Sequence, residues 1–182
     1  LVGPGGTPFG TAALGVIARG TGRDFIRSHA IPTKARDAIR AIAEGPIRTV
    51  DLGEVLSTAD PEGSRRFANA ASCGVTGAIA KRANGMSKRF GGTPTFLVAA
   101  FQGFRGYDNT PVHVELDGRP FDVTASAIVC AIGHSLGGGI KVAHGARQDD
   151  GLLDMVLVGD VGAKDLALNV HRLYTGTLGD HP

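Results

Sequence analysis

Short turns join most of the strand-like segments in this chain. Apolar and polar residues alternate from Val112 to Leu116, Asp117–Gly118 supplies a hairpin turn, and residues 121–132 return as a long strand. Residues 47–57 and 65–72 form a second strand-like pair, separated by the turn-rich segment ADPEGS. Strands that are joined by short turns run antiparallel. The pattern therefore favours an antiparallel or mixed sheet with helices on one side over a doubly wound parallel sheet.

The clearest helix is expected at 34–44, where apolar residues recur at helical spacing. We expect Thr33 to cap this helix and Gly45–Pro46 to stop it. Another helix is expected to begin with Thr93 as its cap and Pro94 at its first position. The full set of further expected elements is helices at 24–30, 75–90, 94–104 and 163–174, a buried strand at 12–18 and another strand at 152–158.

Composition excludes several classes of protein. The length of 182 residues suits one domain or slightly more. The chain has 19 Lys plus Arg against 17 Asp plus Glu, and the basic residues are scattered along the sequence, so no nucleic-acid partner is expected. No run of 18 apolar residues and no signal-peptide pattern occurs, so membrane contact could only be peripheral. The six histidines form no HxxxH or HExxH pair, which argues against a zinc site.

The last general predictions concern the two cysteines and the two ends of the chain. Cys73 and Cys130 lie in apolar stretches without a CxxC motif, which predicts buried, reduced thiols of a cytoplasmic protein, with a structural disulfide as the alternative. The chain opens at Leu1 and stops after TGTLGDHP without a finishing element. We interpret it as a segment of a longer chain.

The segment from Gly133 to Gly137 matches the G-x-S-x-G pattern of a serine hydrolase. It follows an aliphatic strand, as a nucleophile elbow with Ser135 requires, and Asp154 or Asp160 with His171 or His181 are available as triad partners. A chance match is the competing explanation in a chain with 28 glycines. The Gly-rich sequence after Ser135 and the hairpin-connected strands both favour chance.

A strand, a glycine turn and a helix start follow one another between residues 14 and 25. Such a turn directs backbone N–H groups toward one point, which suits a phosphate, and Thr21 adds a hydroxyl. The alternative is a plain strand-to-helix turn in which Thr21 or Asp24 caps the helix.

The segment LGVIARGTGRDFIRSHAIP, residues 14–32, resembles the segment LGIIPAGTGNDFARSLGIP of diacylglycerol kinase and sphingosine kinase catalytic domains. Four further motifs of that family follow in the same order: RTVDLG at 48–53, RFANAASCG at 66–74, GGG at 137–139 and QDDGLLD at 148–154. The resemblance covers essentially the whole chain.

The resemblance implies a fold, a reaction and a division of the chain. Family members transfer the γ-phosphoryl group of ATP to a lipid hydroxyl in a cleft between two domains. The implied fold is α+β: a β-rich, sandwich-like and mainly antiparallel C-terminal domain with helices at 31–182, truncated at its end. Residues 1–30 would be a strand–turn–helix remnant of an α/β nucleotide-binding domain.

The same resemblance assigns the ATP-binding residues. By position, Gly20, Thr21, Gly22 and Arg23 would contact ATP, and Asp24 would support a polar network toward the metal. It identifies no certain catalytic residue in this chain.

The resemblance also implies a Mg²⁺ site in the DDGLLD segment. The cation would be held by the carboxylate of Asp150 and by the backbone carbonyls of Arg147 and Leu152, oxygen donors that suit a hard cation. The alternative is a solvated acidic turn in which Asp149 and Asp154 face water.

The chain departs from the family pattern in several places. Arg23 stands where the family usually has Asn, and Ala18 where it has Pro. The upstream GGDGT loop is absent, and GPGGT at 3–7 is not a convincing substitute. The late DGE segment, thought to supply the general base, is also absent. Asp117–Gly118 is not that segment, because it lies in an earlier hairpin. Because phosphoryl transfer depends on positioning and charge neutralisation, we expect little activity from this segment alone.

These observations lead to one principal hypothesis and two alternatives. The principal hypothesis is a diacylglycerol kinase-like enzyme that uses ATP and Mg²⁺ on a lipid at a membrane surface and forms a phosphatidic-acid-like product. The alternatives are a lipase or esterase using Ser135 and a non-catalytic, metal-stabilised module. The acceptor lipid and the oligomeric state stay open, a homodimer included. Two roles are considered for four phenylalanines: they belong to the core, or they contact the acyl chain of the lipid. These residues are Phe90, Phe96, Phe101 and Phe104.

Overall fold

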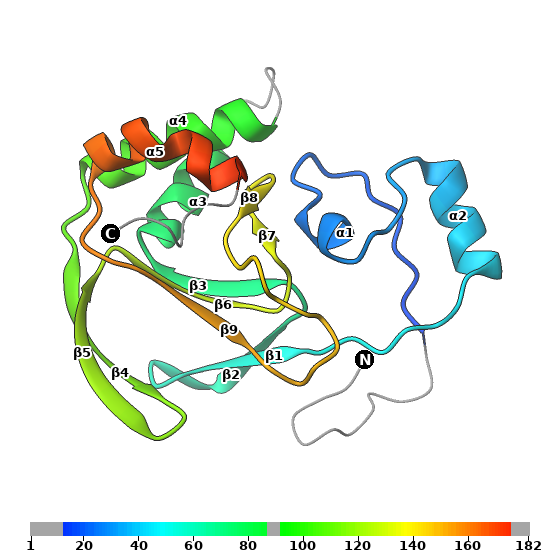
Figure 1. The fold of residues 1–182 in the computed structure, drawn as a ribbon, viewed down its shortest axis with the longest axis horizontal. Coiled ribbons are helices and arrows are strands. Elements are labelled where there is room, and N and C mark those ends of the chain that lie inside the picture. The colour runs from blue at the N-terminus through cyan, green and yellow to red at the C-terminus, as the bar shows by residue number, and fades with distance from the viewer. Residues whose placement is uncertain (1–12, 87–91, 176–182) are drawn as a thin grey trace.

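A three-stranded antiparallel sheet lies at the centre of the computed structural model, which describes residues 13–86 and 92–175 (Figure 1). Its strands are β3 (Ala70–Gly74), β6 (Ala127–Ala131) and β9 (Asp154–Val158), in the order β3-β6-β9. On β6, alternate residues Ala127, Val129 and Ala131 are almost fully buried. This alternation is the period of two that a strand with one covered face requires.

Helices cover one side of this sheet, as the sequence predicted (Figure 1). They are α3 (Val75–Gly85), α4 (Gly92–Arg105) and α5 (Ala163–Thr175). Val75, Ile79, Ala99 and Ala100 join Ala127 in one buried cluster between the helices and the sheet. The small side chains of α4 allow it to approach α3 closely.

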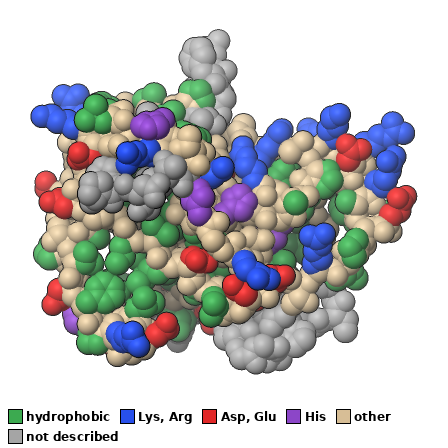
Figure 2. All heavy atoms as spheres, in the orientation of Figure 1, with side chains coloured by type: hydrophobic (Ala, Val, Ile, Leu, Met, Phe, Trp, Pro, Cys, Tyr) green, Lys and Arg blue, Asp and Glu red, His purple; other side chains and the backbone are tan. Residues whose placement is uncertain are grey.

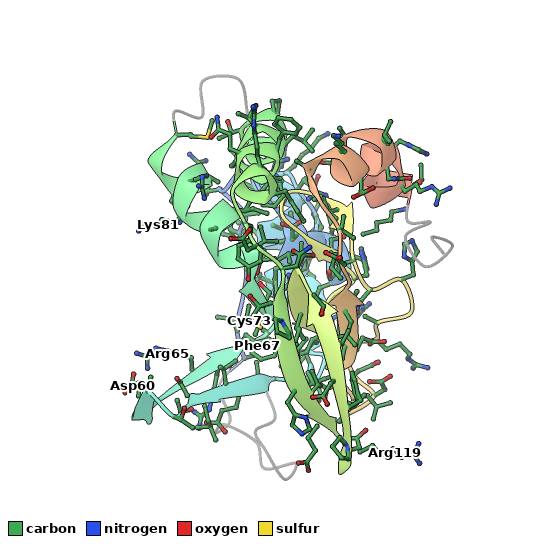
Figure 3. All side chains as sticks on the ribbon, turned by 90° about the vertical axis from the view of Figure 1, so that its left-hand side faces the viewer. Asp60, Arg65, Phe67, Cys73, Lys81 and Arg119 are labelled. Atoms are coloured by element: carbon green, nitrogen blue, oxygen red, sulfur yellow. The ribbon has the colours of Figure 1, made fainter. Side chains whose placement is uncertain are left out.

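Two hairpins occupy the other side. They are β1 (Gly53–Ser57) with β2 (Asp60–Phe67), and β4 (Thr110–Leu116) with β5 (Arg119–Ala125). The predicted turn at Asp117–Gly118 is confirmed, with φ of 50° and 76°, the left-handed values that a two-residue hairpin loop needs. Figure 3 shows the tip of β1–β2, marked by Asp60 and Arg65, projecting from the body of the molecule.

The long strand expected at 121–132 is broken at Ser126. The Ser126 N–H donates to the carbonyls of Val158 (2.8 Å) and Gly159 (3.1 Å), and its own carbonyl accepts from the Val75 N–H (2.8 Å). These bonds tie the bend to the central sheet and to α3. The chain therefore leaves the hairpin at Ser126 and enters the central sheet as β6.

Other strand boundaries also differ from the expectation. The segment 65–72 is divided at residues 68–69 between β2 and β3, and the turn of the first hairpin is Thr58–Ala59 rather than ADPEGS. Residues 13–18 form no strand, contrary to the prediction, and the side chains of Leu14 and Ile17 are 68% and 43% exposed. A buried strand needs hydrogen-bonding neighbours on both sides, and none of the described residues supplies them here.

The helices α1 (Asp24–Ser28) and α2 (Ala35–Glu44) lie beside the main body (Figure 1). Gly45 ends α2 as predicted, but the N-cap is Lys34 rather than Thr33, and α4 begins at Gly92, two residues before Pro94. The other expected helices are confirmed, although α3 ends at Gly85.

The two cysteines are both free thiols, as expected, but Cys73 is exposed rather than buried. It lies on β3, at the edge of the central sheet (Figure 3), where β6 is the one strand of the described residues that pairs with it. Cys130 is partly buried on the central strand. Among the helices of the described residues, none combines the length and apolar character needed to cross a bilayer.

Candidate functional site

The GTGRD turn leads directly into α1. Arg23 has a left-handed backbone (φ 60°, ψ 20°), and its Nε donates to the carbonyl of Gly20 at 3.4 Å. Asn adopts this conformation more readily than Arg, which gives a physical reason for the family's preference at this position. Thr21 and Gly20 are exposed, so their hydroxyl and backbone groups are accessible to a ligand.

The carboxylate of Asp24 joins this turn to a distant glycine turn. Its Oδ2 accepts from the Gly138 N–H at 2.8 Å and its Oδ1 from the Gly139 N–H at 2.7 Å. The glycine turn connects β7 (Ser135–Leu136) to β8 (Ile140–Lys141). Gly137, Gly138 and Gly139 all have positive φ (66°, 87° and 107°), which directs successive N–H groups toward one anion.

Arg27 completes this contact from the next turn of α1. Its Nη1 lies 3.1 Å from Asp24 Oδ1 and also donates to the carbonyl of Gly22. The guanidinium group lies against Gly139, where an added Cβ would meet it at 3.4 Å. Asp24 and Arg27 therefore fix α1, the GTGRD turn and the glycine turn to one another.

A second aspartate connects two other motifs of the sequence analysis. Asp51, in RTVDLG, donates its N–H to the carbonyl of Gln148 at 2.8 Å and accepts the Gly151 N–H on Oδ2 at 2.8 Å. Gly151 has φ of 76°. The acidic turn QDDGLLD is therefore held by a carboxylate about a hundred residues earlier in the chain.

Of the residues expected to hold Mg²⁺, Asp150 and Leu152 lie in this acidic turn and Arg147 directly precedes it. The Asp150 Oδ1 accepts from the Leu152 N–H at 3.1 Å, so the carboxylate folds over the turn toward Leu152. The guanidinium of Arg147 pairs instead with Asp149 at 3.7 Å. One carboxylate with neighbouring backbone carbonyls is an oxygen donor set that fits a hard divalent cation. In residues 13–86 and 92–175 no cluster of three or more His, Cys, Asp or Glu side chains could hold a metal ion, so a cation at this turn would also need backbone carbonyls as ligands.

A partly buried polar cluster beside α1 was not singled out by the sequence analysis. The Asn69 Nδ2 donates to the carbonyl of Ser135 at 2.9 Å, and the Asn69 carbonyl accepts from the N–H groups of Ile132 and Gly133, both at 2.8 Å. Ser28 Oγ lies 3.5 Å from Asn69 Oδ1. Asn69 is thus the centre of the contact between α1, the start of β3 and β7. The only signal in the sequence was its place in the RFAN motif.

His29 ends α1 in the same cluster. Burial lowers its pKa, the backbone of Ala68 opposes this effect and His134 adds to it. The Nε2 of His29 is buried without a hydrogen-bond partner among the described residues. These surroundings therefore favour the neutral form of the imidazole on balance.

The surroundings of Ser135 are not those of a nucleophile elbow. Ser135 lies on β7, is 2% exposed, and is followed by the glycine turn and β8 instead of a helix. Its Oγ lies 2.7 Å from Nδ1 of the adjacent His134. None of the described carboxyl and imidazole groups proposed as partners forms a hydrogen bond with Ser135: Asp160 accepts from Asn109, His171 is exposed on α5, and Asp154 is on β9. His181 falls outside the described residues.

The phenylalanines divide between core and surface. Phe96 and Phe104 pack against the cluster between α3 and α4, whereas Phe101 on α4 is 42% exposed. Phe90 lies outside the described residues. Phe101 is therefore the one of these that could contact an acyl chain from the described surface.

Comparison with known proteins identifies the family. The diacylglycerol kinase catalytic domain matches residues 7–55, and the YegS C-terminal NAD kinase beta sandwich-like domain matches residues 69–182, more than half of the chain. The chain belongs to the diacylglycerol kinase family of lipid kinases. The two matches include the GTGRD turn and the glycine turn that Asp24 connects.

Individual members of the diacylglycerol kinase family agree with this assignment. A diacylglycerol kinase of Staphylococcus carnosus (strain TM300) is 27% identical over 168 residues, covering 92% of this chain and 52% of that protein. A diacylglycerol kinase of Mycobacterium tuberculosis is 30% identical over 148 residues, covering 79% and 46%. The chain spans about half the length of the curated relatives it matches.

The fold agrees as well. The crystal structure of a diacylglycerol kinase from Bacillus anthracis str. Sterne superimposes with a TM-score of 0.61 at 20% identity, covering 85% of this chain and 50% of that chain. The predicted α+β class is confirmed by this likeness and by the antiparallel sheets.

Proposed function

We propose that this chain is part of an ATP-dependent lipid kinase that phosphorylates a diacylglycerol-like lipid. In this reaction the lipid hydroxyl oxygen forms a bond to the γ-phosphorus, the bond from that phosphorus to the β,γ-bridging oxygen breaks, and ADP leaves. The hydroxyl proton passes to a base that is not assigned in this chain. The product is a phosphatidic-acid-like lipid.

The contact of Asp24 with Gly138 and Gly139 is the observation that carries this proposal. It holds the exposed GTGRD turn rigidly against the β-rich part of the chain, so Gly20, Thr21, Gly22 and Arg23 are available to bind ATP. Preorganised donors lower the cost of ordering a charged ligand.

The charge of the same region supports an anionic ligand. Residues 19–48 contain seven Lys and Arg against three Asp and Glu. In Figure 2 the Lys and Arg side chains gather over α1 and α2. This surface would attract the phosphate groups of ATP.

Mg²⁺ is the second ligand in the proposal. Asp150 would bind it through the carboxylate, and Arg147 and Leu152 through their carbonyls. When bound, the cation neutralises negative charge on the acidic turn. Asp51 would keep the turn in position through its bond to the Gly151 N–H.

The remaining assignments follow from the same proposal. Residues 1–30 would belong to the nucleotide-binding domain and residues 31–182 to the C-terminal lipid kinase domain. The enzyme would be cytoplasmic and meet its lipid at the membrane surface, with Phe101 on the acyl-chain side. A homodimer stays a prediction.

A phosphoryl-transfer assay tests this function on the longer protein that contains this chain. Radiolabelled ATP is supplied with vesicles of phosphatidylglycerol that contain dioleoylglycerol, and label in the lipid fraction is measured with and without Mg²⁺. We expect Mg²⁺-dependent transfer, reduced about ten- to a hundredfold by Asp24→Asn because the turn loses its fixed position. Asp37→Asn, an exposed change on α2, is the matched control and should retain the activity.

Two results would contradict the proposal, and a third would correct the expectation about the absent segments. Absence of transfer together with ester hydrolysis that is lost in Ser135→Ala would favour the esterase alternative. Mg²⁺-dependent stability without turnover would favour a non-catalytic module. Transfer by the 182-residue chain at the rate of the longer protein would show that the absent GGDGT and DGE segments are not needed.

A further inference from the structure

The last turn of α5 carries a phenol with an unsatisfied oxygen. The Tyr174 hydroxyl is buried, and no group among the described residues forms a hydrogen bond with it. Buried polar groups almost always have a partner, so an orphaned one suggests that the partner is met in another state of the protein.

The position of Tyr174 indicates which group that partner is. α5 contacts β8, and α1 contacts β7, so the two helices lie on either side of the β7–β8 hairpin. Figure 1 shows the end of α5 beside this hairpin, with α1 on its other side. The turn of the hairpin is the one that binds the carboxylate of Asp24.

Electrostatic interactions agree with this arrangement. Burial raises the pKa of Tyr174, the negative charge of Asp24 raises it further, and Arg27 opposes them. The phenol is therefore within electrostatic range of both members of the Asp24–Arg27 pair.

The carboxylate of Asp24 has room for one more donor. A carboxylate has about four acceptor positions. The described residues fill three of them, from the Gly138 N–H, the Gly139 N–H and Arg27 Nη1. Phosphate groups at the GTGRD turn would also compete with Asp24 for Arg27, which would release a further position on Oδ1.

We propose that Tyr174 is a positioning residue for the nucleotide site, and that its hydroxyl donates a hydrogen bond to the carboxylate of Asp24 when a nucleotide occupies the GTGRD turn. The inference rests on the proposed function, because that function assigns the turn to ATP. Its consequence is that α5, more than a hundred residues after the turn, is part of the nucleotide-responsive structure. Tyr174 acts through Asp24 and need not touch the nucleotide.

Tyrosine labelling tests the coupling directly. The chain has two tyrosines and no tryptophan, so labelling tyrosine with ¹³C at the ring carbon that bears the hydroxyl gives two NMR signals, assigned with Tyr107→Phe. We expect Asp24→Asn to move the Tyr174 signal and leave that of Tyr107, which packs against the α3–α4 cluster, unchanged. We expect added ATP to move the Tyr174 signal in the wild-type chain and not in Asp24→Asn.

Calorimetric ATP titration tests the positioning role. Tyr174→Phe removes only the hydroxyl, and we expect ATP binding to weaken about fivefold, the net effect of one hydrogen bond. Tyr107→Phe is the matched control and should bind ATP as the wild type does. The Tyr107 signal reports whether Tyr174→Phe is folded, and the Asp24→Asn experiment tests the coupling with the Tyr174 side chain intact.

The possible outcomes separate this inference from the proposed function. A Tyr174 signal that does not respond to Asp24→Asn overturns the coupling. A folded Tyr174→Phe chain that binds ATP like the wild type overturns the positioning role. If neither the wild-type chain nor the longer protein that contains it binds ATP while Asp24→Asn still moves the Tyr174 signal, the assignment of the turn to ATP fails and the Tyr174–Asp24 coupling is supported.

Discussion

The carboxylate of Asp24 lies 2.7 Å from the backbone nitrogen of Gly139, although 115 residues separate them in the chain. The bond crosses from α1 to the β7–β8 turn and brings together two motifs that no local interaction could have joined. Because a charged acceptor strengthens hydrogen bonds to backbone N–H groups, this contact is a strong link between the two parts.

Removing the charge of Asp24 should weaken this link measurably. We expect Asp24→Asn to lower the free energy of unfolding by about 1–3 kcal/mol, the range for a hydrogen bond to a charged group. Urea denaturation followed by circular dichroism measures the change. Asp37→Asn, which removes only an exposed charge in the first turn of α2, should cost less, about 0.3–1 kcal/mol. An equal loss of unfolding free energy in the two variants would show that the contact of Asp24 with the glycine turn does not stabilise the fold.

Mg²⁺ should stabilise the chain through the acidic turn. A ligand that binds only the folded state at a hundred times its Kd adds about 2.7 kcal/mol, which for a chain of this size raises Tm by roughly 5–10 °C. We expect this rise in thermal unfolding with Mg²⁺ and its loss in Asp150→Ala. Asp149→Ala, in the same turn but paired with Arg147, is the matched control and should retain the rise. A rise that survives Asp150→Ala would place the cation elsewhere.

A methyl group at Gly133 should disrupt the polar cluster around Asn69. A Cβ built there would lie 2.2 Å from Asn69 Oδ1 and 2.6 Å from Ser28 Oγ, distances at which these atoms must move. We expect Gly133→Ala to destabilise the chain by about 2–3 kcal/mol, through overpacking and loss of buried hydrogen bonds. Gly145 has nothing within 4 Å of the same position, so Gly145→Ala should be nearly neutral in the same denaturation experiment. Similar midpoints for the two variants would contradict the packing seen around Gly133.

His29 should make stability depend on pH. Burial, the larger effect, and His134 lower its pKa from the ordinary value of 6.5. The unfolded chain therefore binds this proton more readily than the folded chain, so the stabilising contribution is full above about pH 6.5 and is lost as the pH falls toward the lowered pKa.

Replacement of His29 tests this dependence. We expect His29→Gln to flatten the fall in the free energy of unfolding below pH 6.5, as measured by denaturation at a series of pH values. The exposed residue His171 supplies the matched control, and His171→Gln should leave the fall unchanged. An unchanged pH dependence in His29→Gln would mean that another group titrates.

Local patterns in the sequence were sufficient to predict several helices and strands. The alternation before Asp117–Gly118 predicted the β4–β5 hairpin, and the apolar spacing before Gly45 predicted α2, because turn conformation and helical period are properties of neighbouring residues. The GTGRD and GGG segments were also recognisable as motifs. Their recognition led to the family that the comparisons confirm.

The contacts between those segments depend on the tertiary structure. The break at Ser126, the exposure of Cys73 and the absence of a strand at 13–18 all depend on which strands lie alongside, a property that a single segment does not contain. The pairing of Asp24 with the glycine turn and the burial of the Tyr174 hydroxyl depend likewise on packing between distant segments. Short-range backbone preferences, which can be read from the amino-acid sequence, therefore specify the local elements and the motifs. The geometry of the site was decided by long-range hydrogen bonds and burial, which arise only when the chain has folded.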